Sequence, residues 1–195
     1  MTAAIAKIIW LLGGVCWYAI RFPFERRNRK KNRIVTSNFD FRETALLGCS
    51  VSGLAVVPLF YVVTGQPAFA NYPFQPVVAI IGILVLGAAL VMFRTSHRAL
   101  GRNWSQSLEL RESHTLVTEG CYRFVRHPMY SAFWLLALSQ VLLLPNWIAG
   151  PAGLVGFGIL FFGRVGREEA MMLETFGESY REYMRRTARV IPGIY

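Results

Sequence analysis

Residues 114–130, with the sequence HTLVTEGCYRFVRHPMY, lie between two long uncharged runs and hold two of the three histidines. Their last part, Arg126 to Tyr130, leads directly into an apolar segment. Pro128 suits the first position of a helix, where the N–H that proline lacks would have no partner within the helix. His127 then falls at the cap, beside backbone N–H groups at the positive end of the helix dipole. The stretch therefore predicts a helix start at a membrane edge that binds a small, partly anionic molecule.

The runs on both sides of this stretch predict an all-α integral membrane protein. No Asp, Glu, Lys or Arg occurs in residues 44–93 or 127–163, and charged residues make up only 16% of the chain. Hydrophobic residues make up 54%, and the mean hydropathy is +0.38. Soluble domains usually carry about 25% charged residues. Each run is long enough for two crossings of about 17–25 residues, and helices satisfy their own backbone where the bilayer offers no water.

Five transmembrane helices are expected, at about residues 2–20, 44–64, 76–93, 128–144 and 148–162. A signal peptide is the alternative for the first, but its charge follows the apolar run and no small-residue cleavage pattern is visible, so we interpret it as a retained span. Pro58 is expected to kink the second span. Residues 145–147 are expected to form a tight turn between the last two spans. A charged, amphipathic cytosolic helix should follow Arg164 and end near Arg189.

The positive charges predict the orientation of these spans. Of the 21 Lys and Arg residues, all but Lys7 fall in residues 21–42, residues 94–126 or the part from Arg164 onward. Five spans with the N-terminus outside place these three segments together in the cytosol, as the positive-inside rule requires. The formal net charge of +10 then describes one membrane face, near acidic headgroups, and does not indicate a nucleic-acid partner.

From about residue 101 onward, the chain resembles the isoprenylcysteine carboxyl methyltransferase family. The residues that carry the resemblance are His114, Thr115, Leu116, Val117, Gly120, Tyr122, Arg126, His127, Pro128, Met129, Tyr130, Arg164, Glu168, Glu169, Phe176, Gly177, Tyr180 and Pro192. The RHP-x-Y motif alone is a weak signal. Together with HTLV before it and Arg-x-x-x-Glu-Glu beyond an apolar hairpin, it becomes a specific one. Structural roles explain each residue singly but not the whole set.

The resemblance implies methyl transfer from S-adenosylmethionine. Matched residue by residue, the family's cofactor-binding set corresponds to His114, Thr115, Leu116, Val117, Tyr122, His127, Pro128, Met129, Tyr130 and Glu168. The family's substrate-binding arginine corresponds to Arg164, so Arg164 and Glu168 are the expected catalytic pair. A family glutamine before HTLV has only Glu109 as a nearby candidate. Aromatic faces of Tyr122 and Tyr130 suit a sulfonium cation, and Glu168 suits a positive charge on the cofactor.

Each of these side chains also has a plainer interpretation. Tyr122 and Tyr130 could be belt residues at headgroup level, where tyrosine rings are common. Arg126 and Arg164 could simply end the spans beside them. Glu169 could be a solvated partner of Arg167 or Arg185.

A single domain is expected, with residues 1–100 mainly a membrane scaffold and residues 101–195 the cofactor-binding and catalytic part. No metal is expected, because the three histidines and three cysteines show no metal-ligand spacing. The predicted function is carboxyl O-methylation of a lipophilic, prenylcysteine-like acceptor in the bilayer, with the site facing the cytosol from an inner membrane or endomembrane. Two alternatives stay open: N-methylation of a phospholipid such as phosphatidylethanolamine, and a non-catalytic lipid-binding protein.

Overall fold

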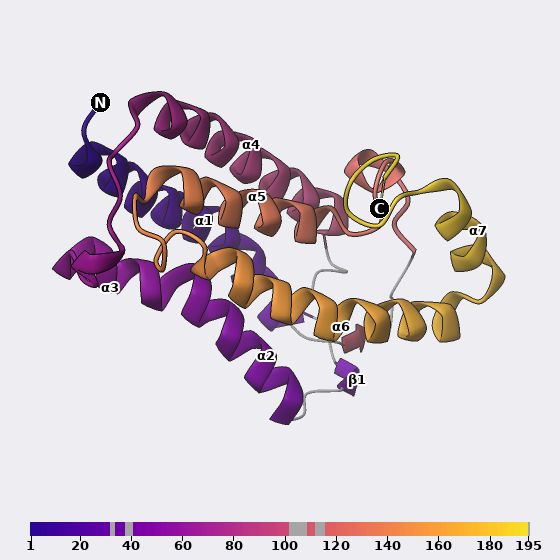
Figure 1. The fold of residues 1–195 in the computed structure, drawn as a ribbon. Helices are drawn as coiled ribbons and strands as arrows, with labels where there is room; N and C mark the ends of the chain where they lie inside the picture. The colour runs from indigo at the N-terminus through magenta and orange to yellow at the C-terminus, as the bar shows by residue number, and fades with distance from the viewer. Residues whose placement is uncertain (32–33, 38–40, 102–108, 112–115, 195) are drawn as a thin grey trace.

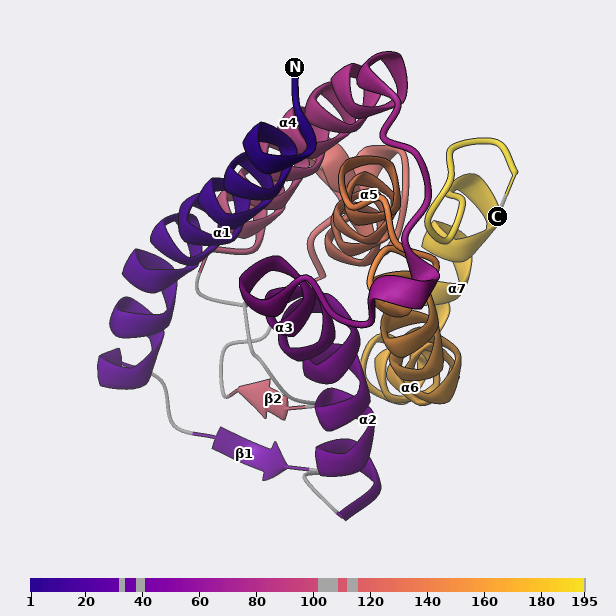
Figure 2. The same ribbon diagram turned by 60° about the vertical axis from the view of Figure 1, so that its left-hand side comes forward.

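The computed structural model describes residues 1–31, 34–37, 41–101, 109–111 and 116–194, and these form a bundle of helices (Figure 1). The helices are α1 (Ala3–Lys31), α2 (Phe41–Val51), α3 (Val57–Thr64), α4 (Pro76–Leu100), α5 (Pro128–Leu143), α6 (Ala152–Phe176) and α7 (Glu178–Arg186). A π-helical turn, Ser52–Val56, joins α2 to α3. Short 3-10 helices cover Ala68–Ala70 and Gly120–Arg123. α5 packs between α4 and α6, while α1 packs on α4 and α2 on α6 (Figure 2).

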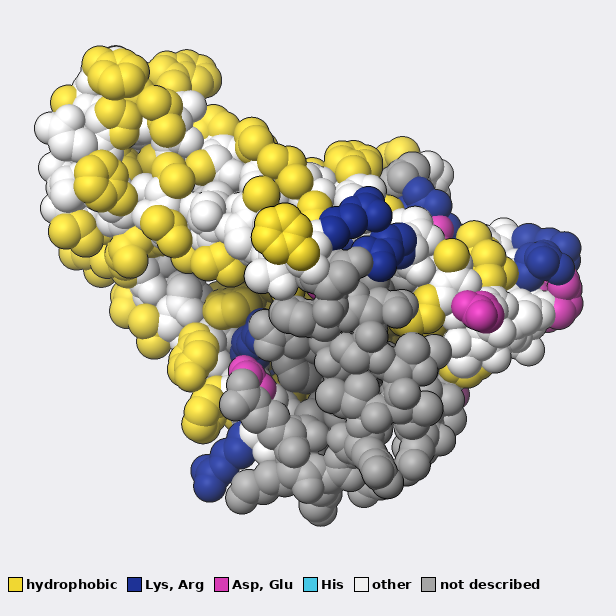
Figure 3. Space-filling model, turned by 90° about the horizontal axis from the view of Figure 1, so that it is seen from below, with side chains coloured by type: hydrophobic (Ala, Val, Ile, Leu, Met, Phe, Trp, Pro, Cys, Tyr) yellow, Lys and Arg dark blue, Asp and Glu magenta, His cyan; other side chains and the backbone are white. Residues whose placement is uncertain are grey.

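Within the part of the chain that the structure describes, three helical segments are long and apolar enough to cross a membrane, Ala3–Arg26, Phe41–Thr64 and Pro76–Leu100. They correspond to the first three expected spans. α5 is a shorter apolar helix of 16 residues. Hydrophobic side chains cover one end of the molecule, and the charged side chains visible in Figure 3 all lie away from that end. The number of crossings and their orientation stay predictions.

A π-helical turn, Ser52–Val56, lies directly before Pro58, where a kink in the second apolar segment was expected. The N–H of Val57 donates to the carbonyl of Ser52, five residues back. In that pattern the carbonyl of Gly53 would need an N–H from residue 58, which proline does not have. The side-chain amide of Gln140, on α5, donates to it instead at 3.1 Å. The π-helical turn is thus stabilised by a polar side chain from another helix.

The turn between α5 and α6 is confirmed, and Asn146 organises it. Its Nδ2 donates to the carbonyl of Pro67 and to Oδ1 of Asn71, both at 2.9 Å. Its Oδ1 accepts the N–H groups of Ile148 and Ala149 at 3.0 and 2.8 Å. The hairpin is therefore tied to the loop between α3 and α4.

The expected end of the fifth helix was wrong. α6 starts at Ala152, later than expected, and continues past Gly163 and Arg164 to Phe176. Gly177, with φ of 54°, makes the break, and α7 ends at Arg186 instead of near Arg189. The apolar run stops near residue 162, but intrahelical hydrogen bonds do not depend on whether the side chains face lipid or water. One rigid helix therefore connects the apolar bundle to the polar site.

Two further features differ from the expected organisation of the chain. α1 extends to Lys31, so much of the expected basic loop after residue 21 is helical. Ile34–Ser37 (β1) pairs antiparallel with Glu109–Arg111 (β2), and Ser37 lies opposite Glu109. Ile34, Val35 and Thr36 are β-branched residues, which favour strands. A small two-stranded sheet therefore accompanies the helices.

Candidate active site

The RHPMY motif forms the start of α5 as predicted. His127 is the N-cap residue, and Pro128 is the first residue of the helix. The imidazole of His127 makes no capping hydrogen bond but stacks on the ring of Tyr130, with centroids 5.4 Å apart and ring planes inclined by 26°. The His127 and Tyr130 side chains are 8% and 9% exposed. A belt position at headgroup level is therefore wrong for Tyr130.

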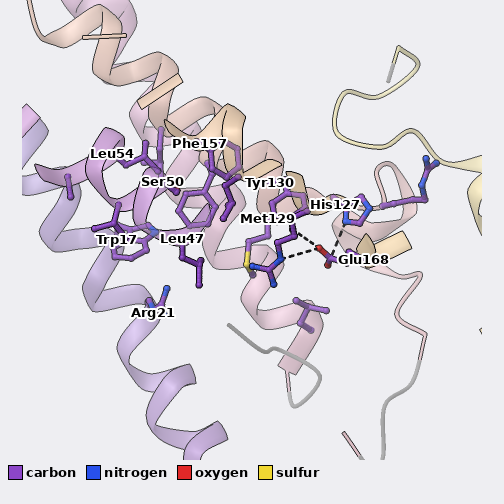
Figure 4. Close-up of a pocket in the computed structure, with 18 of the residues that line it drawn as sticks. Trp17, Arg21, Leu47, Ser50, Leu54, His127, Met129, Tyr130, Phe157 and Glu168 are labelled. Carbon is purple, nitrogen blue, oxygen red and sulfur yellow. Dashed lines mark hydrogen bonds and ion pairs between the residues drawn. The ribbon is translucent and has the colours of Figure 1, made fainter. Parts of the chain in front are cut away.

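Glu168, on α6, lies opposite the start of α5 (Figure 4). Tyr130 Oη donates a short hydrogen bond to its Oε2, at 2.5 Å. Arg164 Nε lies 3.9 Å from the same oxygen, and His127 Nδ1 lies 4.0 Å from Oε1. The carboxylate remains 29% exposed, so it can also reach a ligand.

Glu169 is the centre of a second, more deeply buried cluster. Its Oε1 accepts hydrogen bonds from Arg126 Nε and Arg189 Nε, both at 3.1 Å, and its Oε2 accepts one from Arg189 Nη2 at 2.6 Å. His127 Nε2 lies 3.3 Å from Oε1. Burial alone would raise the pKa of Glu169, but the bonds from His127, Arg189 and Arg126 outweigh it and lower the pKa to about 2. The interpretation of Glu169 as a solvated partner of Arg167 or Arg185 was therefore wrong.

The segment after α7 completes the back of this cluster. The N–H groups of Arg126 and His127 donate to the carbonyls of Ala188 and Arg189, at 2.8 and 2.9 Å. Ser131 Oγ donates to the carbonyl of Val190 at 2.6 Å. Arg126 also donates to the carbonyls of Met184 and Thr187. Arg126 therefore joins two distant parts of the chain and does more than end a span.

Tyrosines from α7 pack beneath the 3-10 turn before the motif. Tyr183 Oη donates to the carbonyl of Tyr122 at 2.6 Å. Burial raises the pKa of Tyr122, Tyr180 and Tyr183, so all three are neutral phenols at physiological pH. Tyr122 is only 7% exposed, so the belt interpretation is wrong for it too.

A cavity of about 570 Å³ lies beside Tyr122, His127 and Glu168, a volume typical of small-molecule sites. One end has Glu168 and His127 on the wall, and the other is mostly apolar, with Trp17, Leu47 and Leu54 next to Arg21 and Ser50 (Figure 4). Eight predicted site residues line it, namely Leu116, Val117, Tyr122, His127, Met129, Tyr130, Arg164 and Glu168. Pro128 is buried behind this wall at the start of α5. His114 and Thr115 lie outside the described residues, and Glu109 lies in β2.

The model of the isoprenylcysteine carboxyl methyltransferase (ICMT) family matches residues 79–174. This segment belongs to the ICMT family. The match contains the motif at the start of α5 together with Arg164, Glu168 and Glu169. The resemblance expected from the sequence is confirmed.

Three relatives carry the description protein-S-isoprenylcysteine O-methyltransferase. A Dictyostelium discoideum protein is 35% identical over 91 residues, which cover 45% of this chain and 37% of that protein. An Arabidopsis thaliana protein is 32% identical over 114 residues, covering 57% of each chain. A Schizosaccharomyces pombe protein is 36% identical over 83 residues, covering 43% of this chain and 35% of that one. The matched part therefore spans between about a third and a little over half of these relatives.

A solved structure of a eukaryotic intramembrane Ras methyltransferase, also an ICMT, has a similar fold. It aligns with a TM-score of 0.54 and 24% identity, over 80% of this chain and 54% of that chain. At this identity, the likeness concerns the fold alone. It extends the similarity beyond the ICMT segment itself, toward the helices that precede it.

Several cavity residues come from α1 and α2, which precede the ICMT segment and were expected to be scaffold. Trp17 and Arg21 reach the cavity from α1, and Leu47 and Ser50 from α2. Glu43, also on α2, pairs with Arg164 behind the cavity wall at 3.0 Å. Glu43 was not among the site residues predicted from the sequence. The signal that could have found it is an acid at the end of one span, level with an arginine at the end of another.

Proposed function

We propose that this chain is a membrane-embedded, S-adenosylmethionine-dependent methyltransferase that methylates the carboxylate of a lipophilic, prenylcysteine-like acceptor. The observation that carries the proposal is the arrangement of Glu168 and Arg164 at one end of a cavity whose other end is mostly apolar. One charge suits a cationic cofactor and the other an anionic acceptor. The apolar end suits a lipid chain. The descriptions of the ICMT relatives support the same chemistry.

The residues on the cavity wall fit S-adenosylmethionine chemically. Glu168 presents a carboxylate that Tyr130 Oη holds in place, and it suits the positive charge of the cofactor. Leu116, Val117 and Met129 offer apolar surface for an adenine ring. When bound, the cofactor would supply an electrophilic methyl group on a sulfonium centre. His114 and Thr115 belong to the proposed cofactor set on the strength of the family motif alone.

Arg164 is proposed to hold the acceptor. A carboxylate is ionised at neutral pH and needs no general base, so the protein mainly has to place it in line with the methyl group. A guanidinium is permanently charged and can hold a carboxylate with two parallel N–H bonds. Arg164 lies one helical turn before Glu168, so both side chains face the same region of the cavity.

The decisive experiment measures cofactor binding and methyl transfer on the purified protein. Calorimetry should detect S-adenosylhomocysteine binding, and a tritiated-methyl assay should favour prenylcysteine over phospholipid acceptors. Arg164→Lys keeps a positive charge beside Glu43 but loses the fork, so turnover should fall at least tenfold while S-adenosylhomocysteine affinity stays the same. Arg123→Lys, which changes an arginine that lies over the Phe124 ring, is the matched control and should keep full activity. Absence of cofactor binding in the wild type would favour the lipid-binding alternative, and labelling of phospholipid alone would favour the amine acceptor.

The same proposal includes five crossings with the polar end of the bundle in the cytosol. Phe69, in the loop between α3 and α4, is 87% exposed, and the Glu178 side chain on α7 is 64% exposed. Single cysteines at these positions, in a chain whose three native cysteines have been replaced, should react with an impermeant reagent from opposite sides. Labelling of both from one side would contradict the topology.

A further inference from the structure

We infer that Glu43 is a positioning residue for methyl transfer, although it lies on α2, before the ICMT segment. It holds the guanidinium of Arg164 and so leaves the carboxylate of Glu168 available to the cofactor. This inference rests on the proposed function.

The buried position of Glu43 requires a cationic partner that offsets the cost of removing its carboxylate from water. It lies in the first turn of α2, its side chain is fully buried, and its Oε1 is 3.0 Å from Arg164 Nη1. The Arg164 side chain is 9% exposed. A buried carboxylate without a compensating cation is costly, and so is a buried guanidinium without an anion. The two side chains therefore depend on one another.

Close packing between α2 and α6 fixes this pair in register. Arg42 Nη2 donates to the carbonyl of Gly163 at 3.1 Å, one residue before Arg164. A Cβ at Gly163 would lie 2.8 Å from Leu46 Cδ2, so the side chain of Leu46 occupies that space. Farther along, a Cβ at Gly156 would collide with backbone atoms of α2. Small residues that let helices approach in this way are typical of membrane interfaces.

The position of Glu43 determines which carboxylate Arg164 pairs with more closely. Residues four apart on a helix are natural ion-pair partners, so Arg164 and Glu168 would pair closely if nothing else intervened. In the structure that pair is loose, since Arg164 Nε lies 3.9 Å from Glu168 Oε2. Arg164 Nη1 lies closer to Glu43, at 3.0 Å from its Oε1. The Glu168 carboxylate accepts the hydroxyl of Tyr130 instead.

The charges of these side chains explain why the pairing of Arg164 with Glu43, and not with Glu168, matters for cofactor binding. Glu43 and Arg164 neutralise one another, so the three side chains with Glu168 carry one net negative charge next to the cavity. That surplus attracts a cationic cofactor, and Arg164 remains beside the cavity for an anionic acceptor. Without the charge of Glu43, Arg164 would close on Glu168. Arg164 and Glu168 would then neutralise one another before any ligand binds. The positive charge of the cofactor would lose Glu168 as its binding partner.

The test compares S-adenosylhomocysteine affinity in the wild type, Glu43→Gln and the double variant Glu43→Gln with Arg164→Gln. Glutamine has nearly the shape of glutamate but no charge, so Glu43→Gln should weaken binding about tenfold, the scale of one charge-assisted hydrogen bond. Removing Arg164 as well frees Glu168 again. The double variant should therefore bind within about threefold of the wild type while it stays inactive toward the acceptor.

The rescue tests whether Arg164 acts through Glu168, and the melting temperature of each variant separates this from a stability effect, because the double variant also removes the unpaired buried charge that Glu43→Gln leaves. Glu43→Asp keeps the charge on a shorter side chain and should restore part of the affinity. Glu178→Gln, in an exposed pair with Arg181, is the control and should bind normally. If Glu43→Gln does not fold, the double variant still decides, because it leaves no unpaired charge. Unchanged binding in Glu43→Gln, or weak binding in the double variant, would overturn the inference, whereas a wild type that binds nothing would instead refute the proposed function.

Discussion

Replacing Glu169 by glutamine should destabilise the fold by about 3 kcal/mol. The Glu169 side chain is 6% exposed and accepts hydrogen bonds from Arg126 and Arg189, with His127 beside it. These partners lower its pKa from 4.5 to about 2 despite burial. At 1.36 kcal/mol per pKa unit, that difference amounts to about 3 kcal/mol in favour of the charged form. Removing one partner of a buried ion pair typically costs about 3–5 kcal/mol, so the two scales agree.

Thermal unfolding in detergent measures this effect. For a chain of this size, each kcal/mol lowers the midpoint by about 2–4 °C, so Glu169→Gln should melt about 6–12 °C below the wild type. The matched control is Glu178→Gln, whose partner Arg181 lies 2.7 Å away, because its side chain is 64% exposed. Exposed ion pairs contribute little, and this variant should melt close to the wild type. If the two variants melt at the same temperature, the buried cluster does not stabilise the fold and the reasoning is refuted.

Three other outcomes are expected. Because the pKa of Glu169 is lower in the folded chain, its contribution is complete above about pH 4.5 and is lost as the pH falls toward 2, so the difference in melting temperature between the wild type and Glu169→Gln should shrink below pH 4.5. Tyr130→Phe keeps the ring but removes the donor to its carboxylate partner, and calorimetry should show S-adenosylhomocysteine binding about three- to tenfold weaker, whereas Tyr72→Phe at the far end of α5 should not change it. Gly53→Ala would drive a methyl group into the backbone of α6 and should lower the melting temperature, in contrast to Gly48→Ala, where a Cβ meets nothing within 4 Å.

Local signals in the sequence predicted the parts of the fold that depend on local geometry. Pro128 marks the start of α5 because its missing N–H is harmless there. Pro58, in the first turn of α3, follows the π-helical turn, and residues 145–147 mark the hairpin turn. The end of α6 was not predictable from hydrophobicity, since Arg164 changes the surroundings of the helix without interrupting its backbone bonds. A glycine in a conformation that other residues avoid, Gly177, ends it instead.

The candidate site divides in a similar way. Family motifs predicted Tyr130, Arg164 and Glu168, and these side chains do meet at one cavity. Glu43 was missed because its role depends on the register between two helices that lie more than a hundred residues apart, which no local pattern records. The pairing of residues 188–190 with the start of α5 was missed for the same reason, since an extended segment with no periodicity gives no signal of its partner.

That pairing has a consequence for the order in which the protein matures. Translation delivers the RHPMY motif about sixty residues before the carbonyls of Ala188 and Arg189 that its N–H groups require. Until those residues emerge, the amides of Arg126 and His127 must bond to water, and the Arg189 partner of Glu169 does not yet exist. The apolar helices can insert and pack during this interval, whereas the site cannot. Maturation of the site is therefore a late, post-insertion event, and a released chain truncated before residue 188 should form its helices but lack a finished binding site.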